Sequence, residues 1–413
     1  MIRCIQGLLA SLLIWPGASV LAAPVDTPAV TPPSQVVAVR SDAALQGWVS
    51  RFRPTALARG IAPSVYDRAM ADVRYLPDVV RRDRSQFEFT KTIWDYLSTA
   101  VSDTRVSNGR RALRRHQGLL RQIESRYGVE AEVLVAIWGL ESAYGEVRGS
   151  TPILSAMATL AHDGRRGRFF EGQLIAALRI LQSGDTTLRQ LKGSWAGAMG
   201  HTQFMPTSYQ AYAVDWDGDG RRDIWGNDPA DALASAAAYL ARHGWNRGQP
   251  WGVEVQLPDG FDYAQASRSI TRSPAAWARM GVVGLDGRAV PNHGAASLLV
   301  PAGHQGAAFM IFENFAVLER YNTADAYVVA VGHLSDRITG GGPIRAGWPL
   351  GDRALTFDER VALQRLLTRQ GYDTRGIDGR IGPLTIDAVR RYQRDNGMVP
   401  DGYASLRLLE RLR

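Results

Sequence analysis

Apolar residues recur at helical spacing from about Ala43 to Ala196, and this pattern constrains the fold more than any other feature of the sequence. It is clearest in three groups: Leu45, Trp48 and Phe52; Leu119, Leu120 and Ile123; and Leu174, Ala177 and Leu181. The single cysteine, Cys4, stands at the N-terminus, so this part of the chain must be stable without disulfides, which its length allows. The sequence therefore predicts a large helical unit.

The first residues run from a short basic start through an apolar stretch, Ile5 to Trp15, to small residues. This order is typical of a secretory signal peptide, residues 1–22, with cleavage after Ala22. The apolar stretch is shorter than the roughly twenty residues of a membrane-spanning helix. Because Cys4 would be removed, no lipid anchor is expected. We expect a soluble, exported, periplasmic protein without a transmembrane segment.

Changes in composition divide the remainder of the chain. Residues 23–42 are rich in proline and small polar residues, which is typical of a flexible tether. Short alternating segments between turn sequences predict a small β-rich insertion at 252–308. Helical spacing returns at 312–338, and a glycine-rich run marks a linker at 340–354.

The last residues, 355–413, predict a compact module of three helices. Thr356 and Glu359 form a capping box ahead of an apolar helix. A second short helix ends at Gly397, and a third covers Leu406 to Leu412.

Glu141 is the one carboxylate in the stretch V-L-V-A-I-W-G-L-E-S-A-Y-G, Val133 to Gly145, where it ends an otherwise apolar helix. Desolvation disfavours the charged form of a carboxyl group and raises its pKa, so such a glutamate can donate a proton near neutral pH. A glycosidic oxygen is a suitable acceptor. The alternative is a glutamate exposed at a helix end, and spacing alone does not decide between the two.

The segment D-W-D-G-D-G-R-R-D, Asp215 to Asp223, is a candidate cation site. Acidic residues at relative positions 1, 3, 5 and 9, with glycine at 6, match the front of an EF-hand loop. The glutamate expected at position 12 is replaced by Gly226. The alternative is an Asp/Gly-rich turn that binds no metal.

Several stretches of the chain resemble the MltB-like family of lytic murein transglycosylases. The longest, L-K-G-S-W-A-G-A-M-G-H-T-Q-F-M-P-T-S-Y, is close to the family signature. These stretches are Phe87 to Phe89, Gly139 to Gly145, Leu191 to Tyr209 and Tyr321 to Asn322. The likeness covers residues 43–339 and implies a lysozyme-like catalytic domain, α+β but mainly α, followed by the three-helix module.

The resemblance implies that Glu141 protonates the glycosidic oxygen between N-acetylmuramic acid and N-acetylglucosamine and then acts as base on the muramyl 6-hydroxyl. The product would be a 1,6-anhydro sugar, whereas ordinary glycosidases use two carboxylates. Polar residues expected by resemblance to line the cleft are Ser194, Gln203, Tyr321 and Asn322. Arg165 and Arg166 match a basic pair that the family places near wall carboxylates. Aromatic side chains that could face sugar rings are Tyr144, Trp138, Trp195, Phe204 and Tyr209.

Each of these site residues also has a purely structural interpretation: turns and caps for the polar side chains, a solvated surface for the arginines, and core for most aromatics. For the acidic loop, the resemblance implies a structural calcium ion without a chemical role, and no cofactor for the chemistry. The expected ligands are Asp215, Asp217, Asp219, Arg221 and, downstream, Asp231, with Asp228 as a rival for the last position.

The C-terminal module resembles a peptidoglycan-binding domain. Its D-G-x-x-G-x-x-T element is intact at Asp378 to Thr385, whereas a second copy, Asp401 to Ser405, lacks the later glycine and threonine. A net charge of +8 indicates an acidic partner, and for an exported protein this favours wall polymer over nucleic acid.

Two alternatives to a lytic transglycosylase stay open at this point: a hydrolytic muramidase, and a non-catalytic peptidoglycan-binding protein. The sequence holds no H-E-x-x-H, G-x-S-x-G or P-loop motif, and its seven histidines are scattered without metal-ligand spacing. A wall peptidase is therefore not expected.

Overall fold

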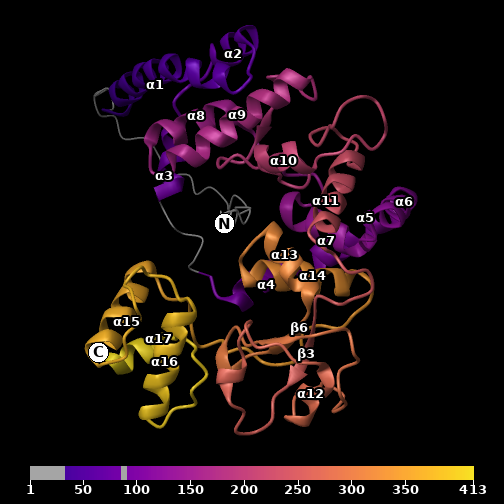
Figure 1. Cartoon of the computed structure of the whole chain (residues 1–413), viewed down its shortest axis with the longest axis vertical. Helices are drawn as coiled ribbons and strands as arrows, with labels where there is room; N and C mark the ends of the chain where they lie inside the picture. Colours follow the sequence, from indigo (N-terminus) through magenta and orange to yellow (C-terminus); the bar gives the residue numbers. More distant parts are fainter. Residues whose placement is uncertain (1–32, 85–90) are drawn as a thin grey trace, which may run out of the picture. The chain divides into compact units, whose positions relative to one another are not determined.

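The computed structural model describes residues 33–84 and 91–413 (Figure 1), with side chains described from Asp42 onwards. The predicted signal peptide and Phe87 to Phe89 lie outside the described residues. Two compact units divide the described part. We call them the signature unit, residues 33–84 and 137–238, and the sheet unit, residues 91–136 and 239–413.

The signature unit is helical, as the apolar spacing predicts. Helix α8 packs along α9, which also contacts α2 and α10. Its helices are α1 (Pro33–Ala58), α2 (Pro63–Met70), α3 (Pro77–Arg84), the end of α7 (Ala131–Ser142), α8 (Ile153–Asp163), α9 (Gly167–Ser183), α10 (Pro206–Tyr212) and most of α11 (Ala230–Arg242). A short antiparallel pair, β1 (Thr151–Pro152) and β2 (Lys192–Gly193), completes it.

Helix α1 corrects the predicted boundary of the tether. The helix begins at Pro33, so residues 33–42 of the predicted tether are helical. Proline fits the first turn of a helix, because the N–H that it lacks would have no partner there. The proline-rich composition therefore marks a helix start as well as a tether.

The sheet unit contains the predicted β-rich insertion as a four-stranded antiparallel sheet in the order β4-β3-β6-β5. The strands are β3 (Gly252–Gln256), β4 (Val283–Gly284), β5 (Ser297–Leu299) and β6 (Ala308–Ile311). Trp277 of α12 is fully buried in the core of this sheet. The remaining helices before the module are α4 (Ile93–Ala100), α5 (Asp103–Arg115), α6 (Gln117–Tyr127), α12 (Pro274–Arg279), α13 (Glu313–Tyr321) and α14 (Asp325–Ile338). No helix in the described ranges is long and apolar enough to cross a membrane.

The C-terminal module consists of the three predicted helices, α15 (Phe357–Arg369), α16 (Pro383–Asp395) and α17 (Leu406–Leu412), drawn in yellow in Figure 1. The capping box of Thr356 and Glu359 is formed by both of its hydrogen bonds. Leu363, Val389 and Leu409, one from each helix, are fully buried in its core.

Two half-motifs within this module have the same hydrogen-bond pattern. In each, a helical glutamine donates to an aspartate and accepts the N–H of the glycine that follows it. The two sets are Gln364, Asp378 and Gly379, and Gln393, Asp401 and Gly402. The second copy therefore keeps its geometry although it lacks the later glycine and threonine.

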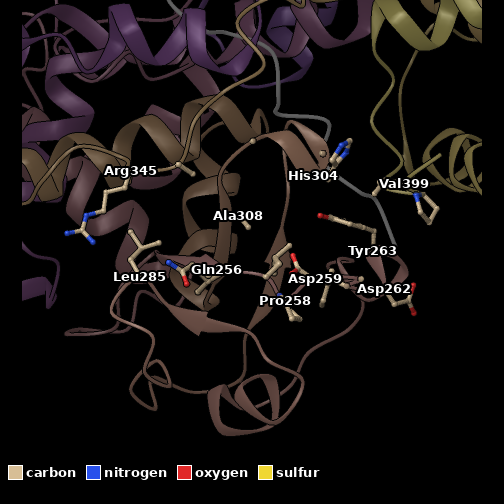
Figure 2. A pocket seen from close by; sticks show the side chains of 18 residues that line it. Gln256, Pro258, Asp259, Asp262, Tyr263, Leu285, His304, Ala308, Arg345 and Val399 are labelled. Atoms are coloured by element: carbon tan, nitrogen blue, oxygen red, sulfur yellow. The ribbon is translucent and has the colours of Figure 1, made fainter. Parts of the chain in front are cut away.

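The second half-motif is occupied by a contact outside the module. The Oδ2 atom of Asp401 accepts the backbone N–H of His304 at 3.0 Å and lies 2.6 Å from its Nδ1. Arg390 donates to the carbonyl oxygen of Ala266 at 3.1 Å. A cavity of about 880 Å³ lies beside this contact, and Figure 2 shows His304, Tyr263 and Val399 around one end of it.

The linker, which has neither helix nor strand, is also bound to β3 and α4. The carboxylate of Glu254 accepts the backbone N–H groups of Arg345 and Ala346, the latter at 2.7 Å. The ring of Trp348 stacks on Trp94 of α4 with 6.0 Å between ring centroids. The module is thus docked through its own residues and through its linker.

We expect Asp401→Ala to release the module, because the change removes the acceptor of both His304 contacts. Hydrogen bonds to a charged group are worth about 1.5–3 kcal/mol, so trypsin cleavage of the linker after Arg345 should accelerate about tenfold or more.

Asp378→Ala is the matched control, since it breaks the equivalent bonds inside the module and leaves the docking contact intact. Equal cleavage rates of Asp401→Ala and Asp378→Ala would contradict the docking.

Candidate active site

Glu141 lies in the last turn of α7, a helix that is apolar and buried from Val133 to Leu140. Leu134, Ile137 and Leu140 of this helix are at most 5% exposed, and Glu141 itself is 5% exposed. A helix with no polar face has to be buried all round. The alternative interpretation of Glu141 as an exposed residue at a helix end is therefore wrong.

The backbone after Glu141 makes an unusual turn. Ala143, Tyr144 and Gly145 have φ angles of 50°, 62° and 88°, all in the left-handed region. For a residue other than glycine this conformation costs about 1–2 kcal/mol. The hydroxyl of Ser142 stabilises the turn, since it accepts the N–H of Gly145 at 3.0 Å and donates to the carbonyl of His201 at 2.6 Å.

This turn folds Tyr144 back onto α7. A Cβ atom at Gly139 would lie 2.6 Å from the Tyr144 ring, so only glycine leaves room for it. The ring also meets Trp138 edge to face, with 5.9 Å between centroids. The motif from Gly139 to Gly145 is thus a unit in which each residue type has a steric or hydrogen-bonding reason.

Ser194 and Gln203 both stabilise the signature stretch. Ser194 accepts the N–H of Ala198 at 3.0 Å through its hydroxyl, which closes a turn. Gln203 has a φ of 50° and donates to the carbonyls of Gly200 and Arg148 at 2.7 and 3.2 Å. Both side chains therefore have the structural role that was their alternative interpretation. A contact with substrate would be a second role.

The aromatic candidates divide by burial. Trp138, Phe204 and Tyr209 are at most 3% exposed and belong to the core. Trp195 and Tyr144 are partly exposed.

Tyr321 and Asn322 lie in the sheet unit, where α13 ends before α14. The side-chain oxygen of Asn322 accepts the N–H of Ala324 at 3.0 Å, and Asn322 is 5% exposed. The ring of Tyr321 meets Tyr239 edge to face at 5.2 Å. Both residues are held by the turn that joins these two helices.

Arg165 and Arg166 share one carboxylate, that of Asp83 in α3. Arg165 donates to one oxygen of Asp83 at 2.6 Å, and Arg166 pairs with the other oxygen. Burial would raise the pKa of Asp83, but hydrogen bonds from both guanidinium groups outweigh it and lower that pKa. The two arginines are therefore neither a simple solvated surface nor fully available to a ligand. One of their two positive charges is balanced.

The acidic loop brings together three of the predicted metal ligands. Oxygens of Asp215, Asp217 and Asp219 lie within 4.8 Å of one another, and all three residues are exposed. Backbone N–H groups hold them in place: Asp215 accepts those of Gly218 and Gly220 at 2.8 and 2.9 Å. Clustered carboxylate oxygens fit a hard cation such as calcium.

Asp231 is placed differently from these three and does not belong to their cluster. It is 4% exposed, and its two oxygens accept the N–H groups of Trp216 and Asp223 at 2.8 and 2.7 Å. Burial raises the pKa of Asp231 to about 6 against the opposing effect of these bonds. Its rival Asp228 accepts the N–H of Ala230 at the start of α11. Asp231 thus bonds to the backbone near both ends of the loop, at Trp216 and at Asp223.

His201 was not among the predicted site residues, although it stands inside the signature stretch. It is 3% exposed and accepts a hydrogen bond from the indole N–H of Trp138 at 3.0 Å. Asp83, the partner of the arginine pair, was also missed. Neither residue has a local sequence signal, because their partners lie far away along the chain.

Two segments of the chain match known protein families. Residues 44–336 match the family described as transglycosylase SLT domain, and residues 358–412 match a putative peptidoglycan binding domain. The membrane-bound lytic murein transglycosylase B of Escherichia coli is 36% identical over 253 residues, 59% of this chain and 66% of that protein, just under two thirds of its length.

Two solved structures are similar over most of the chain. SltB3 from Pseudomonas aeruginosa, in complex with NAG-anhNAM-pentapeptide, is 48% identical with a TM-score of 0.87, over 89% of this chain and 99% of that one. Slt35 from Escherichia coli, in complex with calcium, is 30% identical with a TM-score of 0.61, over 72% and 93%. The chain therefore belongs to the MltB-like lytic transglycosylases of the transglycosylase SLT family and carries a C-terminal peptidoglycan-binding domain.

Proposed function

We propose that the chain cleaves the β-1,4 bond between N-acetylmuramic acid and N-acetylglucosamine in peptidoglycan, with formation of 1,6-anhydromuramic acid. The observation that carries this proposal is the buried carboxyl group of Glu141 at the end of an apolar helix, inside a family motif. The complex of the related SltB3 with a ligand named NAG-anhNAM-pentapeptide supports the same product class.

In this mechanism Glu141 transfers one proton in each of two steps. As general acid it donates its proton to the glycosidic oxygen, and the bond from that oxygen to muramyl C1 breaks. As general base it then takes the proton of the muramyl 6-hydroxyl, whose oxygen bonds to C1. The carboxyl group ends protonated, no water is consumed, and a single carboxylate serves both steps.

The burial of Glu141 suits this chemistry better than hydrolysis. Water would compete with the 6-hydroxyl for C1, and a site that excludes water removes this competitor. A hydrolytic muramidase would instead need a second carboxylate or another group that activates water.

Substrate orientation is proposed for Ser194, Gln203, Tyr144, Tyr321 and Asn322, whose hydroxyl and amide groups suit N-acetyl groups and sugar hydroxyls. For Arg165 and Arg166 we propose a weaker attraction of wall carboxylates. Asp83 balances one of their two charges, so one positive charge is left to act on an anionic ligand.

We also propose that Asp215, Asp217 and Asp219, with the backbone carbonyl of Arg221, hold a structural calcium ion, and that Asp231 completes the site. The bound ion would supply positive charge that offsets the repulsion among these carboxylates. The calcium complex of the related Slt35 supports the proposal.

The module and the N-terminal residues support a location at the wall. We propose that the C-terminal domain binds peptidoglycan, in line with its family match at residues 358–412. Export to the periplasm is proposed from the signal-peptide pattern of residues 1–22.

Glu141→Gln tests the catalytic role, because glutamine keeps the shape of the side chain and cannot donate or accept the transferred proton. We expect the release of fragments from purified peptidoglycan to fall by about 100- to 10,000-fold. Mass spectrometry of the wild-type products should show muropeptides one water lighter than reducing ends.

Glu124→Gln, at a partly exposed residue that pairs with Arg247, is the control for the loss of one negative charge. Reducing-end products would indicate a muramidase. Unchanged product release by Glu141→Gln would reject the assignment, and no product from either protein would favour a wall-binding protein without catalysis.

Calcium is expected to stabilise the folded protein. A concentration about 100 times Kd contributes about 2.7 kcal/mol, which raises Tm by several degrees. Asp217→Asn keeps an acceptor for the N–H of Asp219 while removing a charge, so it should abolish this shift in a thermal melt.

Asp228→Asn separates the two candidates for the last ligand. It should keep the response to calcium if Asp231 completes the site. Loss of the response in Asp228→Asn would assign that position to Asp228, and no response in the wild type would reject the calcium site.

A further inference from the structure

His201 joins the end of α7 to the end of the acidic loop through hydrogen bonds on two sides, and all partners lie in the signature unit. On the α7 side, its Nδ1 accepts the indole N–H of Trp138 at 3.0 Å, and its carbonyl accepts the hydroxyl of Ser142 at 2.6 Å. On the loop side, its Nε2 lies 2.8 Å from the carbonyl oxygen of Gly226, and its backbone N–H donates to Ile224 at 3.0 Å.

The partners fix the tautomer of the ring. An indole N–H is only a donor, so Nδ1 of His201 must be unprotonated, and the remaining proton sits on Nε2 and is donated to Gly226. Burial lowers the pKa of His201, the nearby Arg148 lowers it as well, and the bond to Gly226 opposes both. The ring is therefore a neutral bridge with one acceptor and one donor, each of them used.

Packing around the ring leaves little freedom. A Cβ atom at Gly145 would lie 2.4 Å from a carbon of the His201 ring. At Gly200, a Cβ atom would lie 2.3 Å from the carbonyl oxygen of Ile224. The turn after α7 thus packs against the imidazole of His201, and the end of the acidic loop packs against the backbone of the neighbouring Gly200 and contacts the ring through Gly226.

Glu141 stands between the two residues of α7 that His201 holds. Trp138 precedes it by nearly one helical turn, and Ser142 follows it directly. We propose that His201 is a positioning residue that transmits the conformation of the acidic loop to α7 and thereby sets the position of Glu141. This inference rests on the proposed role of Glu141 and adds a means of regulating it.

A cation bound in the acidic loop would then influence catalysis without touching substrate. A cation held by Asp215, Asp217 and Asp219 would order the loop whose far end includes Gly226. A change that removes the hydrogen bonds of His201 should therefore weaken the effect of calcium on kcat. Bound calcium would change kcat by changing the position of Glu141. Without the hydrogen bonds of His201, bound calcium would change Tm alone.

The kinetic test compares His201→Phe with His162→Phe. Phenylalanine keeps a flat ring and removes both ring hydrogen bonds. On solubilised glycan strands we expect kcat to fall about 10- to 100-fold with little change in KM, since a displaced catalytic group loses rate more than binding. His162→Phe is the matched control, because His162 contacts only the rings of Trp48 and Tyr75 among the aromatic contacts described and should keep wild-type kcat.

Two further variants test the same hydrogen bonds. His201→Gln retains a group that can donate to Gly226 and should recover part of kcat. Should His201→Phe fail to fold, Trp138→Phe removes the donor of the same bond and takes its place. Circular dichroism and Tm of each variant establish that the fold is intact.

A readout without substrate tests the transmission itself. In protein with 15N-labelled tryptophan, the indole N–H signal of Trp138 is identified by its absence from Trp138→Phe. Calcium chloride should shift this signal in the wild type and should leave it unmoved in His201→Phe.

Wild-type kcat in folded His201→Phe would overturn the positioning role, and a Trp138 signal that ignores calcium while Tm rises would overturn the transmission. Full activity of Glu141→Gln would instead reject the proposed function, and the spectroscopic result on His201 would be unaffected by it.

Discussion

Helix α7 has no polar residue from Val133 to Leu140, so the surrounding structure must cover it on every side. This constraint gives Glu141 its environment, because a carboxyl group at the end of such a helix is buried with its neighbours. Burying a polar group is costly unless it has partners. The cost is consistent with a residue kept for chemistry, since any apolar side chain would fill the same place more cheaply.

The turn after α7 shows how the signature stretch supports that helix. Ala143 and Tyr144 adopt left-handed backbone conformations that disfavour side chains, and the energy to hold them comes from contacts elsewhere. Ser142 and His201 provide two of these contacts. The family motif and the signature stretch, about 50 residues apart in sequence, are therefore joined by hydrogen bonds into one structure.

The parts of the fold that depend on local pattern could be predicted from the sequence, and those that depend on distant contacts could not. Helical spacing, the capping box at Thr356 and the alternating strands are local, and the structure contains all of them. The pairing of Arg165 with Asp83 joins residues 82 positions apart, and no spacing rule indicates it. The same holds for His201, whose role became visible only from its partners. The predicted tether extended past Pro33 because proline is common both in tethers and at helix starts.

The docked module changes how wall binding can assist catalysis. A flexible tether raises the effective concentration of a second site over a broad range of geometries, and the gain depends on linker length. Here the linker is bound by Glu254 and Trp94, and the second half-motif is occupied through Asp401. A module held in this way keeps one orientation relative to the sheet, so its contribution to wall binding depends on the docking contacts and not on linker length alone.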